Sequence, residues 1–550
     1  MRITFVALGW EQLSVSLLTA LAKRDGHEVS LAFSPGLFHD RYNLHVPFLA
    51  NLFDDRDHVL HTIAKQKPDV LAFSAMTATY QWMLGIARDA KRMDPNVKVL
   101  FGGVHASAVP DRVLQQEPVD FVCVGEGDLA FRFILQAIAR KNFSSPIPNT
   151  RYKSPDGKII QGSQSGFIQD LDSLPGFDKS LWEEYIRLGD IYFTMASRGC
   201  PFRCTYCFNN FYSQLGGAHK TKYVRQRSAE HMLQELRHAR RRYNLRLVEF
   251  EDDIFTFNKP WLKGFLSRYK KEIGIPFQCL SHPSFMDDDV IRWLSEAGCR
   301  FVQMGIQSAD ENFKNQVIKR YEKNRQIETV METMRKFHVE LKVDHMFGLP
   351  GEPLAAQESA RELYARTPPY RIQTFWMNYF PGTEMTEYAL SNGLLSSAEV
   401  ENLKDGKQAD FYRDSSKMTV PRNRNLYAAY ETVFKLLPMT PPGLRKHLQA
   451  RRFQKLPKFL NSGISFMADI ISGLWNKNPD HAGYAKYYLH HMIRFVLLKC
   501  GRPVPPATRA RCEDSFPGRG TDSQSFPERG AGQPAPSEPA LVFRKGNSIL

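Results

Sequence analysis

Two series of short apolar runs that alternate with helical patterns dominate this sequence. In the first, strand-like runs lie at residues 3–8, 28–33, 69–74, 97–101 and 120–124. Amphipathic helical patterns, such as residues 13–23 and 80–93, lie between them. Short apolar strands separated by helices are typical of a parallel sheet that is covered on both faces. Five such units predict an α/β domain with the Rossmann-like, flavodoxin-like strand order.

The second series begins at Ile191 and contains six units. Its strand-like runs lie at residues 191–195, 247–250, 277–281, 301–305, 341–347 and 372–376. Helical patterns between them lie at residues 229–243, 287–297, 326–337 and 355–366. Six βα units predict a partial (β/α)6 TIM-type barrel. In such barrels the chemistry gathers at the carboxyl ends of the strands.

Three cysteines follow the first strand of this second series, in Cys200-Pro-Phe-Arg-Cys204-Thr-Tyr-Cys207. Gly199 and Pro201 shape a loop that can wrap an ion or a cluster. An iron–sulfur cube normally takes four cysteine thiolates. Three thiolates at this CxxxCxxC spacing would hold three irons and leave the fourth open to a non-protein ligand.

Structural zinc and a disulfide are the simpler interpretations of the same cysteines. Structural zinc sites usually pair their cysteines as two CxxC knuckles, and no second CxxC or CxxC…HxxxH partner follows here. A disulfide would leave one of the three cysteines odd. The spacing therefore favours a three-thiolate site with a vacancy.

This stretch resembles the signature of the radical S-adenosylmethionine (SAM) superfamily, in which an aromatic residue, here Tyr206, precedes the last cysteine. The resemblance implies that Cys200, Cys204 and Cys207 hold a [4Fe-4S] cluster and that Tyr206 flanks the adenine of SAM. In that superfamily the open iron chelates the amino and carboxylate groups of SAM. An electron from the cluster then splits SAM into methionine and a 5′-deoxyadenosyl radical, which abstracts hydrogen from an unreactive position.

Further polar residues follow later strands of the predicted barrel. By the same resemblance, the acidic group Glu251, Asp252 and Asp253 helps to hold the SAM amine. Gly305-Ile-Gln-Ser308 is similar to the GxES motif of that superfamily, whose polar residues, here Gln307 and Ser308, lie near the ribose. A helix N-cap cluster is the alternative for the acidic trio, because aspartate is favoured there.

Three loops follow strands of the first series: Ser74-Ala-Met-Thr77, Gly102-Gly-Val-His105 and Gly125-Glu-Gly-Asp128. Ligands of open α/β sheets sit beyond the carboxyl ends of the strands. Glycines let the backbone approach a ligand closely, and helix N-termini favour anionic groups. Each loop taken alone is explained equally well as a structural turn.

Together these loops resemble the cobalamin-binding domain that precedes many radical SAM cores. The contacts implied are Ser74, Thr77, Gly102, Gly103, His105, Gly125, Glu126 and Gly127. The DxHxxG motif, which supplies a lower cobalt ligand in cobalamin mutases, does not occur after the first strand, where the sequence reads Leu8-Gly-Trp-Glu-Gln-Leu13. His39 and His45 follow the second strand, and we expect both to be surface or packed histidines.

Outside the two series the pattern changes three times. Proline and glycine break residues 141–190 into turns, which predicts a linker with Lys158-Ile-Ile160 as one arm of a small hairpin. Residues 391–500 are predicted to be helical, with an amphipathic pattern at Met467, Ile470, Ile471 and Leu474. Residues 501–550 are rich in Pro, Gly and Ser, which predicts a disordered tail. The expected domains are 1–140 (cobalamin-binding), 141–190 (linker), 191–390 (radical SAM core), 391–500 (helical) and 501–550 (tail).

Composition and charge indicate the cellular compartment and the kinds of partner that such a protein has. Of the eight cysteines, three are grouped and five are scattered, which fits a reducing compartment. Nothing resembles a signal peptide, and no apolar run reaches the ~18 residues needed to span a bilayer, so we expect a cytoplasmic protein. Between residues 440 and 500 there are ten Lys or Arg and two acidic residues. Such a basic surface can bind nucleic acid, anionic lipid or an acidic substrate, although a solvated face is commoner. We expect no nucleic acid among the partners.

The two pieces stand in the order used by cobalamin-dependent radical SAM enzymes of the class B methyltransferase type. This implies methylation of an unactivated carbon in a small-molecule or lipid-like metabolite, with a flavodoxin or ferredoxin as the reductant. Two alternatives stay open: a cobalamin-dependent cyclase or rearrangement enzyme, and a non-catalytic iron–sulfur partner protein. A tRNA methylthiotransferase is disfavoured, because its N-terminal domain would need further cysteines and this one has only Cys123.

Overall fold

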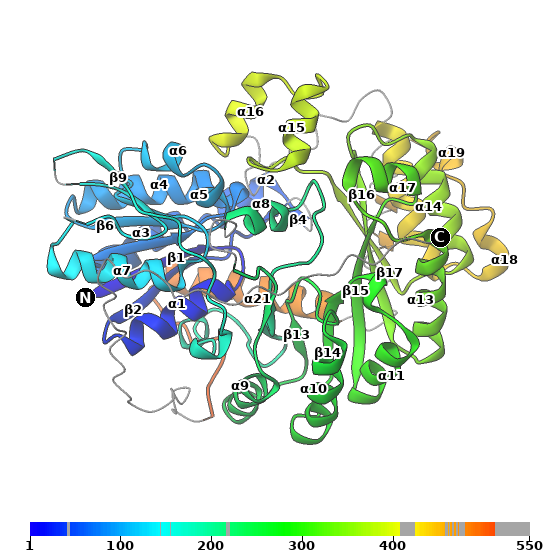
Figure 1. Ribbon diagram of the computed structural model, residues 1–550, viewed down its shortest axis with the longest axis horizontal. Helices are drawn as coiled ribbons and strands as arrows, with labels where there is room; N and C mark the ends of the chain where they lie inside the picture. The colour runs from blue at the N-terminus through cyan, green and yellow to red at the C-terminus, as the bar shows by residue number, and fades with distance from the viewer. Residues whose placement is uncertain are drawn as a thin grey trace, which may run out of the picture. The chain divides into compact units, whose positions relative to one another are not determined.

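The computed structural model in Figure 1 describes residues 1–40, 44–143, 145–154, 156–215, 221–407, 424–456 and 479–511, with a few single residues between 460 and 471. The chain divides into two compact units, 1–516 and 517–550, of which the second lies outside the described residues. Ile470, Leu474 and residues 512–550 also lie outside them. The amphipathic pattern and the disordered tail therefore stay predictions.

The first sheet contains five parallel strands in the order β2-β1-β5-β6-β7. Their bounds are β1 Arg2–Leu8, β2 Glu28–Ser34, β5 Val70–Ser74, β6 Lys98–Gly102 and β7 Phe121–Cys123. Counted along the chain this is the 2-1-3-4-5 order, so the flavodoxin-like prediction is confirmed.

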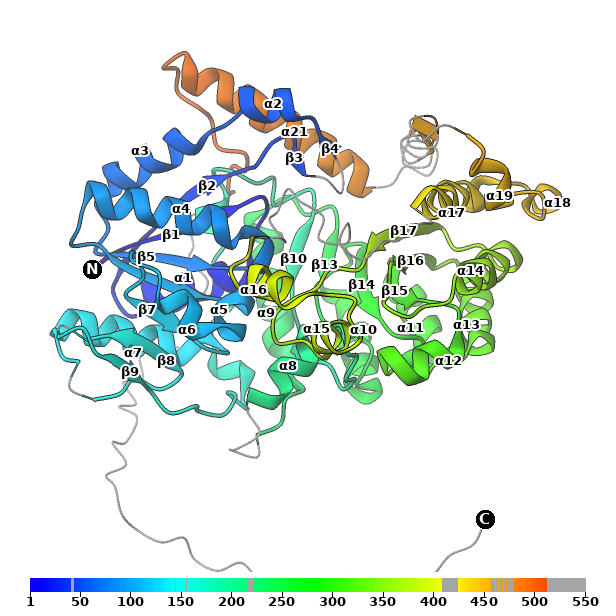
Figure 2. The same cartoon turned by 90° about the horizontal axis from the view of Figure 1, so that it is seen from above.

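Helices cover both faces of this sheet (Figures 1 and 2). On β1, Phe5 and Ala7 belong to the apolar cluster that includes residues of α1 and α7, whereas Val6 belongs to the cluster that includes residues of α3 and α4. Alternate side chains of the strand are therefore buried on opposite faces. The helix bounds are α1 Leu13–Arg24, α2 Pro47–Leu52, α3 Arg56–Gln66, α4 Thr77–Met93, α5 Val104–Ala108, α6 Pro110–Leu114 and α7 Gly127–Arg140.

A hairpin from the expected linker extends the same sheet. Strand β8 (Thr150–Lys153) pairs antiparallel with β7, and β9 (Ile159–Gln161) pairs with β8. The predicted hairpin arm is therefore present, but it belongs to the first sheet. Tyr152 is fully buried, and its ring stacks on that of Phe121 at 5.6 Å, which explains why the hairpin adds to this edge.

The second sheet is parallel throughout, in chain order β10-β13-β14-β15-β16-β17. Its strands are β10 Tyr192–Thr194, β13 Val248–Phe250, β14 Phe277–Ser281, β15 Cys299–Gln307, β16 Glu340–Phe347 and β17 Arg371–Trp376. The covering helices are α9 Ala229–Arg242, α10 Lys259–Glu272, α11 Asp288–Ala297, α13 Asn324–Lys336 and α14 Ala355–Arg366. The partial (β/α)6 barrel is confirmed.

Shorter elements surround the cysteine loop. Strand β11 (Ser197–Arg198) precedes it and α8 (Phe208–Leu215) follows it. After α8, β12 (Arg225–Gln226) pairs with β11 in a two-stranded ribbon. After β17 the chain forms α15 (Glu384–Ser391) and α16 (Ser397–Lys404). The backbone N–H of Met385 donates to the carbonyl of Thr205, so α15 lies against the cysteine loop.

The described C-terminal region is helical, as predicted, with α17 Arg424–Leu436, α18 Pro442–Arg445, α19 Ala450–Phe453 and α21 Pro479–Lys499. Helix α21 returns to the first sheet, where the Tyr487 hydroxyl donates to the carbonyl of Gly9 and the His491 ring lies 5.7 Å from that of Phe33. None of the helices among the described residues combines the length and the apolarity needed to cross a membrane.

Candidate functional site

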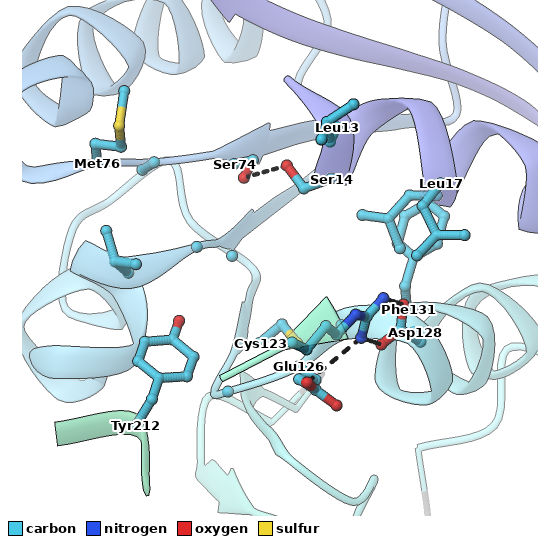
Figure 3. A pocket seen from close by; sticks show the side chains of 18 of the residues that line it. Leu13, Ser14, Leu17, Ser74, Met76, Cys123, Glu126, Asp128, Phe131 and Tyr212 are labelled. Carbon is cyan, nitrogen blue, oxygen red and sulfur yellow. Dashed lines mark hydrogen bonds and ion pairs between the residues drawn. The ribbon is translucent and has the colours of Figure 1, made fainter. Parts of the chain in front are cut away.

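A cavity of about 470 Å³ lies at the carboxyl ends of β5, β6 and β7 (Figure 3). From the first domain it is lined by Ser74, Gly102, Gly103, Gly125, Glu126 and Gly127. Opposite them it is lined by Arg198, Gly199, Asn209, Tyr212 and Asp253, which flank the cysteine loop or follow β13. One cavity therefore contacts both of the regions that the sequence singled out.

Gly103 sets the shape of the loop after β6. Its φ is +90°, and an added Cβ would lie 2.7 Å from both the nitrogen and the oxygen of Ala75. Ala75 in turn donates to the Gly102 carbonyl at 2.8 Å and accepts from the N–H of His105 at 3.1 Å. Only glycine fits this close approach of two loops, which leaves bare backbone facing the cavity.

Thr77 and His105, two of the predicted cobalamin contacts, lie behind the cavity wall. Both are buried, and Nδ1 of His105 lies 3.1 Å from Oγ1 of Thr77. The His105 ring also packs on that of Tyr80, with centroids 4.2 Å apart. Burial lowers the pKa of His105 to about 4, so its imidazole is neutral at pH 7. Their side chains support the loop from the domain core.

The cavity also has lining residues that the sequence did not indicate. Ser14, in the first turn of α1, hydrogen-bonds to Ser74 with their hydroxyl oxygens 3.1 Å apart. Leu13, Leu17 and Phe131 provide an apolar wall beside this polar pair (Figure 3). These residues follow the first strand or lie in helices, where no glycine or motif marks them.

The cysteine loop carries three free thiols. Cys204 is buried, and Cys200 and Cys207 are half-buried. The loop passes so close to the next chain segment that a Cβ on Gly199 (φ +86°) would lie 2.6 Å from the carbonyl oxygen of Tyr223. Burial raises the pKa of the Cys200 thiol to about 12 and that of Cys207 to about 11. These thiols are thus neutral until a cation displaces their protons.

The donor set fits an iron–sulfur cube, because each thiolate of a cube binds its own iron. Cys200, Cys204 and Cys207 offer three thiols from one short loop, with Cys204 buried and the other two half-buried.

The acidic trio divides into different roles. Asp252 is fully buried and accepts hydrogen bonds from the Ala196 N–H (3.0 Å) and the Ser197 hydroxyl, so it fixes the chain just before the cysteine loop. Burial raises its pKa to about 7. Asp253 lines the cavity and accepts from Nδ2 of Asn209 at 2.7 Å.

Glu251, the first residue of the trio, is half-buried, and burial raises its pKa. The N-cap alternative for the trio is wrong, because α10 begins at Lys259 and its N-cap is Asn258. The structure thus places only Asp253 on the cavity.

Arg320 connects Tyr206 with the C-terminal end of β15. Its Nη1 donates to the Tyr206 hydroxyl at 3.3 Å, and its Nη2 donates to the Gly305 carbonyl at 2.6 Å. Ser308 is fully buried, and its hydroxyl accepts a backbone N–H at 3.2 Å. Gln307 has a φ of +66°, and its Oε1 is buried with no hydrogen-bond partner among the described residues. Sequence reasoning missed Arg320, because an arginine 12 residues beyond the motif has no spacing signal.

Comparison with known proteins agrees with this geometry. The family "B12 binding domain" matches residues 4–135, and the family "Radical SAM superfamily" matches residues 195–363. A protein of Pyrococcus horikoshii named "Uncharacterized methyltransferase PH0819" is 27% identical over 377 residues, which cover 67% of this chain and 80% of that protein.

Two solved structures share the fold. The cobalamin-dependent SAM radical enzyme OxsB, with aqua-cobalamin and SAM bound, has a TM-score of 0.60 at 12% identity, covering 91% of this chain and 79% of that one. The radical SAM methyltransferase TsrM of Kitasatospora setae, with cobalamin and a [4Fe-4S] cluster bound, has a TM-score of 0.56 at 15% identity, covering 82% and 99%.

Proposed function

Because this chain belongs to the cobalamin-dependent radical SAM enzymes, with a B12-binding domain followed by a radical SAM domain, we propose that it methylates an unactivated carbon of a small molecule. Its cofactors are a [4Fe-4S] cluster, SAM and cobalamin. When bound, the cluster and SAM supply the radical that removes a hydrogen atom, and cobalamin supplies the methyl group.

The observation that supports the proposal is the cavity of about 470 Å³ shared by the two domains. A substrate carbon that loses hydrogen and then gains a methyl group has to stay within reach of both sites. The cavity is lined by the glycine loops on one side and by the flank of the cysteine loop on the other. Reacting groups held in one cavity avoid the entropic cost of a second encounter.

Within this arrangement the residues of the chain have separate tasks. Cys200, Cys204 and Cys207 hold the cluster, and Asp253 offers a carboxylate to the SAM amine. Gly103 and Gly125 present backbone to the cobalamin. The reductant is a flavodoxin or ferredoxin, and the protein works in the cytoplasm, on a small-molecule or lipid-like metabolite.

The test is anaerobic reconstitution with iron, sulfide and cobalamin, followed by incubation with reductant, trideuteromethyl-labelled SAM and a metabolite extract. We expect 5′-deoxyadenosine, S-adenosylhomocysteine and a metabolite that carries the labelled methyl group, all detected by mass spectrometry. 5′-Deoxyadenosine without any labelled product or S-adenosylhomocysteine would instead indicate a cyclase or rearrangement enzyme. Absence of all three would indicate a non-catalytic iron–sulfur protein.

A further inference from the structure

Two arginines face each other on the ribbon whose two strands precede and follow the cysteine loop. In the antiparallel pairing of β11 with β12, Arg198 stands directly opposite Arg225. Like charges at directly opposed positions destabilise a strand pair. Arg198 is also only two residues before Cys200, so the ribbon is the stem from which the cysteine loop extends.

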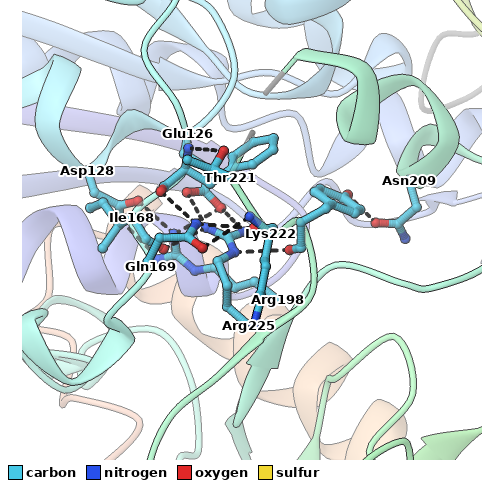
Figure 4. Close-up of polar contacts among 11 residues, drawn as sticks. Glu126, Asp128, Ile168, Gln169, Arg198, Asn209, Thr221, Lys222 and Arg225 are labelled. Carbon is cyan, nitrogen blue, oxygen red and sulfur yellow. Dashed lines mark hydrogen bonds and ion pairs between the residues drawn. The ribbon is translucent and has the colours of Figure 1, made fainter. Parts of the chain in front are cut away.

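The charges of this ribbon are neutralised by the first domain (Figure 4). Arg198 donates from Nη1 and Nη2 to the two carboxylate oxygens of Asp128, at 2.6 and 3.0 Å. Arg225 donates from Nη1 and Nη2 to the two oxygens of Glu126, at 2.9 and 2.6 Å. A third contact joins Arg198 to Glu126 at 3.4 Å. Both main pairs are bidentate, the strongest geometry for a guanidinium and a carboxylate.

These four side chains, called here the arginine–carboxylate bridge, are largely shielded from water. The Arg225 and Asp128 side chains are 3% and 5% exposed. Burial alone would raise the pKa of Asp128, but the adjacent Arg198 guanidinium holds it below its ordinary value. Arg225 also donates to the Ile168 carbonyl at 3.0 Å and lies over the Phe167 ring. Removal of either partner would leave a buried charge without compensation.

The loop that supplies the carboxylates is also the loop that lines the cavity. All four residues of Gly125-Glu-Gly-Asp128 line the cavity, and so do Arg198 and Arg225, so the bridge itself forms part of the cavity wall. A ligand that orders the glycines therefore also orders the carboxylates, because they alternate along four residues of one backbone.

A second contact joins the same loop to the other end of the cysteine loop. The Gly125 N–H donates to the Ser107 hydroxyl at 2.9 Å. The Tyr212 hydroxyl, on helix α8 just after Cys207, lies 3.1 Å from that same Ser107 oxygen. The segments before and after the three cysteines are thus both attached to residues 107–128 of the first domain.

We propose that the arginine–carboxylate bridge couples the two cofactor sites, so that cobalamin bound at the Gly125–Asp128 loop strengthens SAM binding at the cysteine loop. This inference rests on the proposed function, because it takes cobalamin as the occupant of the cavity. Arg198 and Arg225 are then positioning residues. Coupling is reciprocal, so SAM must strengthen cobalamin binding by the same factor. Typical couplings are 5- to 150-fold, and we expect about tenfold here.

The experiment measures the dissociation constant of SAM on the full-length, anaerobically reconstituted protein, with and without cobalamin. Binding is followed by the change that SAM causes in the electron paramagnetic resonance spectrum of the reduced cluster, which needs no substrate and no turnover. The variants are Asp128→Asn, Arg198→Gln and the double variant. Arg237→Gln is the matched control, because it breaks an ion pair with Glu272 between α9 and α10, away from the cavity.

In the wild-type protein and in Arg237→Gln, cobalamin should lower the dissociation constant of SAM about tenfold. In each single bridge variant that ratio should fall toward one, and the double variant should lose no more than the single ones, as expected for partners in one interaction. Arg198→Lys keeps the charge but loses the bidentate contact, so its ratio should fall in between. If the neutral variants do not fold, the ratio measured for Arg198→Lys tests the coupling in their place.

Two results would overturn the coupling. One is a wild-type protein whose dissociation constant for SAM does not change when cobalamin is added. The other is a set of bridge variants in which cobalamin lowers that constant as much as in the wild type. Failure of the proposed function looks different. In that case the wild-type protein takes up no cobalamin, as read from its visible absorbance, whatever the state of the bridge.

Discussion

Lys179 and Glu11 form an ion pair that is closed to solvent, with Nζ 2.5 Å from Oε1 and side chains only 1% and 0% exposed. The same ammonium donates to the Phe193 carbonyl at 2.6 Å. It thereby joins the loop after β1 of the first sheet to β10, the first strand of the second. Burial raises the pKa of Glu11 even though Lys179 lowers it, so the carboxylate depends on its partner to stay ionised.

Replacing Lys179 by methionine should destabilise the protein by about 3–5 kcal/mol, because it leaves Glu11 buried without a counter-charge. Urea unfolding followed by circular dichroism measures the loss. The double variant Glu11→Leu/Lys179→Met should recover most of it. Lys23→Met is the control: its pair with Asp178 is 39% and 21% exposed and should be worth less than about 1 kcal/mol. If Lys179→Met lowered the free energy of unfolding by as little as Lys23→Met, Lys179 would not be the group that neutralises the buried Glu11.

Single replacements of Cys200, Cys204 or Cys207 by alanine should each remove most of the iron and the acid-labile sulfide after anaerobic reconstitution, because a cube held by two thiolates loses a third of its protein ligands. Iron analysis and the broad visible absorbance of the cluster measure the effect. Cys500→Ala, which alters an exposed thiol far along the chain, should keep the wild-type iron content. Full iron content in any of the three loop variants would rule that cysteine out as a ligand.

Gly103→Ala should weaken cobalamin binding at least tenfold, since its Cβ would lie 2.7 Å from the Ala75 backbone and the loop would have to move. Gly26→Ala is the matched control, with a similar φ of +80° but no atom within 4 Å of the added Cβ. It should cost about 1–2 kcal/mol of stability from backbone strain and leave cobalamin affinity unchanged. A cobalamin titration followed by visible absorbance distinguishes the two variants. If Gly103→Ala and Gly26→Ala bound cobalamin with equal affinity, the role of Gly103 would be refuted.

His105 should make the protein less stable in acid. Its pKa is lowered from 6.5 to about 4 by burial, so between these values the unfolded chain binds the proton more readily than the folded one. Stability from this residue is present above pH 6.5 and is lost as pH falls toward 4, by at most about 3 kcal/mol. His105→Asn should flatten the fall in denaturation midpoint between pH 7 and pH 4.5. Part of the fall remains in this variant, because burial also lowers the pKa of His345 to about 4. A slope identical to wild type would contradict this account.

The order of both sheets could be predicted because strand and helix periods alternate so regularly along the chain. The place of the hairpin β8–β9 could not. Its residues show a strand period, but their partner is decided by which edge of the sheet is open and by the fit of Tyr152 on Phe121. Pairing across an edge depends on tertiary packing rather than on the local pattern.

The motifs identified the loops of the site but not the direction of each side chain. Thr77, His105 and Asp252 lie in the expected loops, yet the turns of the backbone point them into the interior, where they hold the loops in shape. Arg198 and Arg225 had no sequence signal at all. Their carboxylate partners lie 70 and 99 residues away, so only the folded chain reveals the pairing.

The docking of α21 on the first sheet matters for how the protein is made. Tyr487 reaches a carbonyl that was synthesised 478 residues earlier, and Tyr488 and His491 cover the rings of Phe38 and Phe33. A nascent chain on the ribosome therefore carries its N-terminal domain with this aromatic face uncovered until residues 487–491 have been synthesised. Fragments that stop before residue 479 keep that face open permanently, and they should aggregate during expression unless a chaperone shields it.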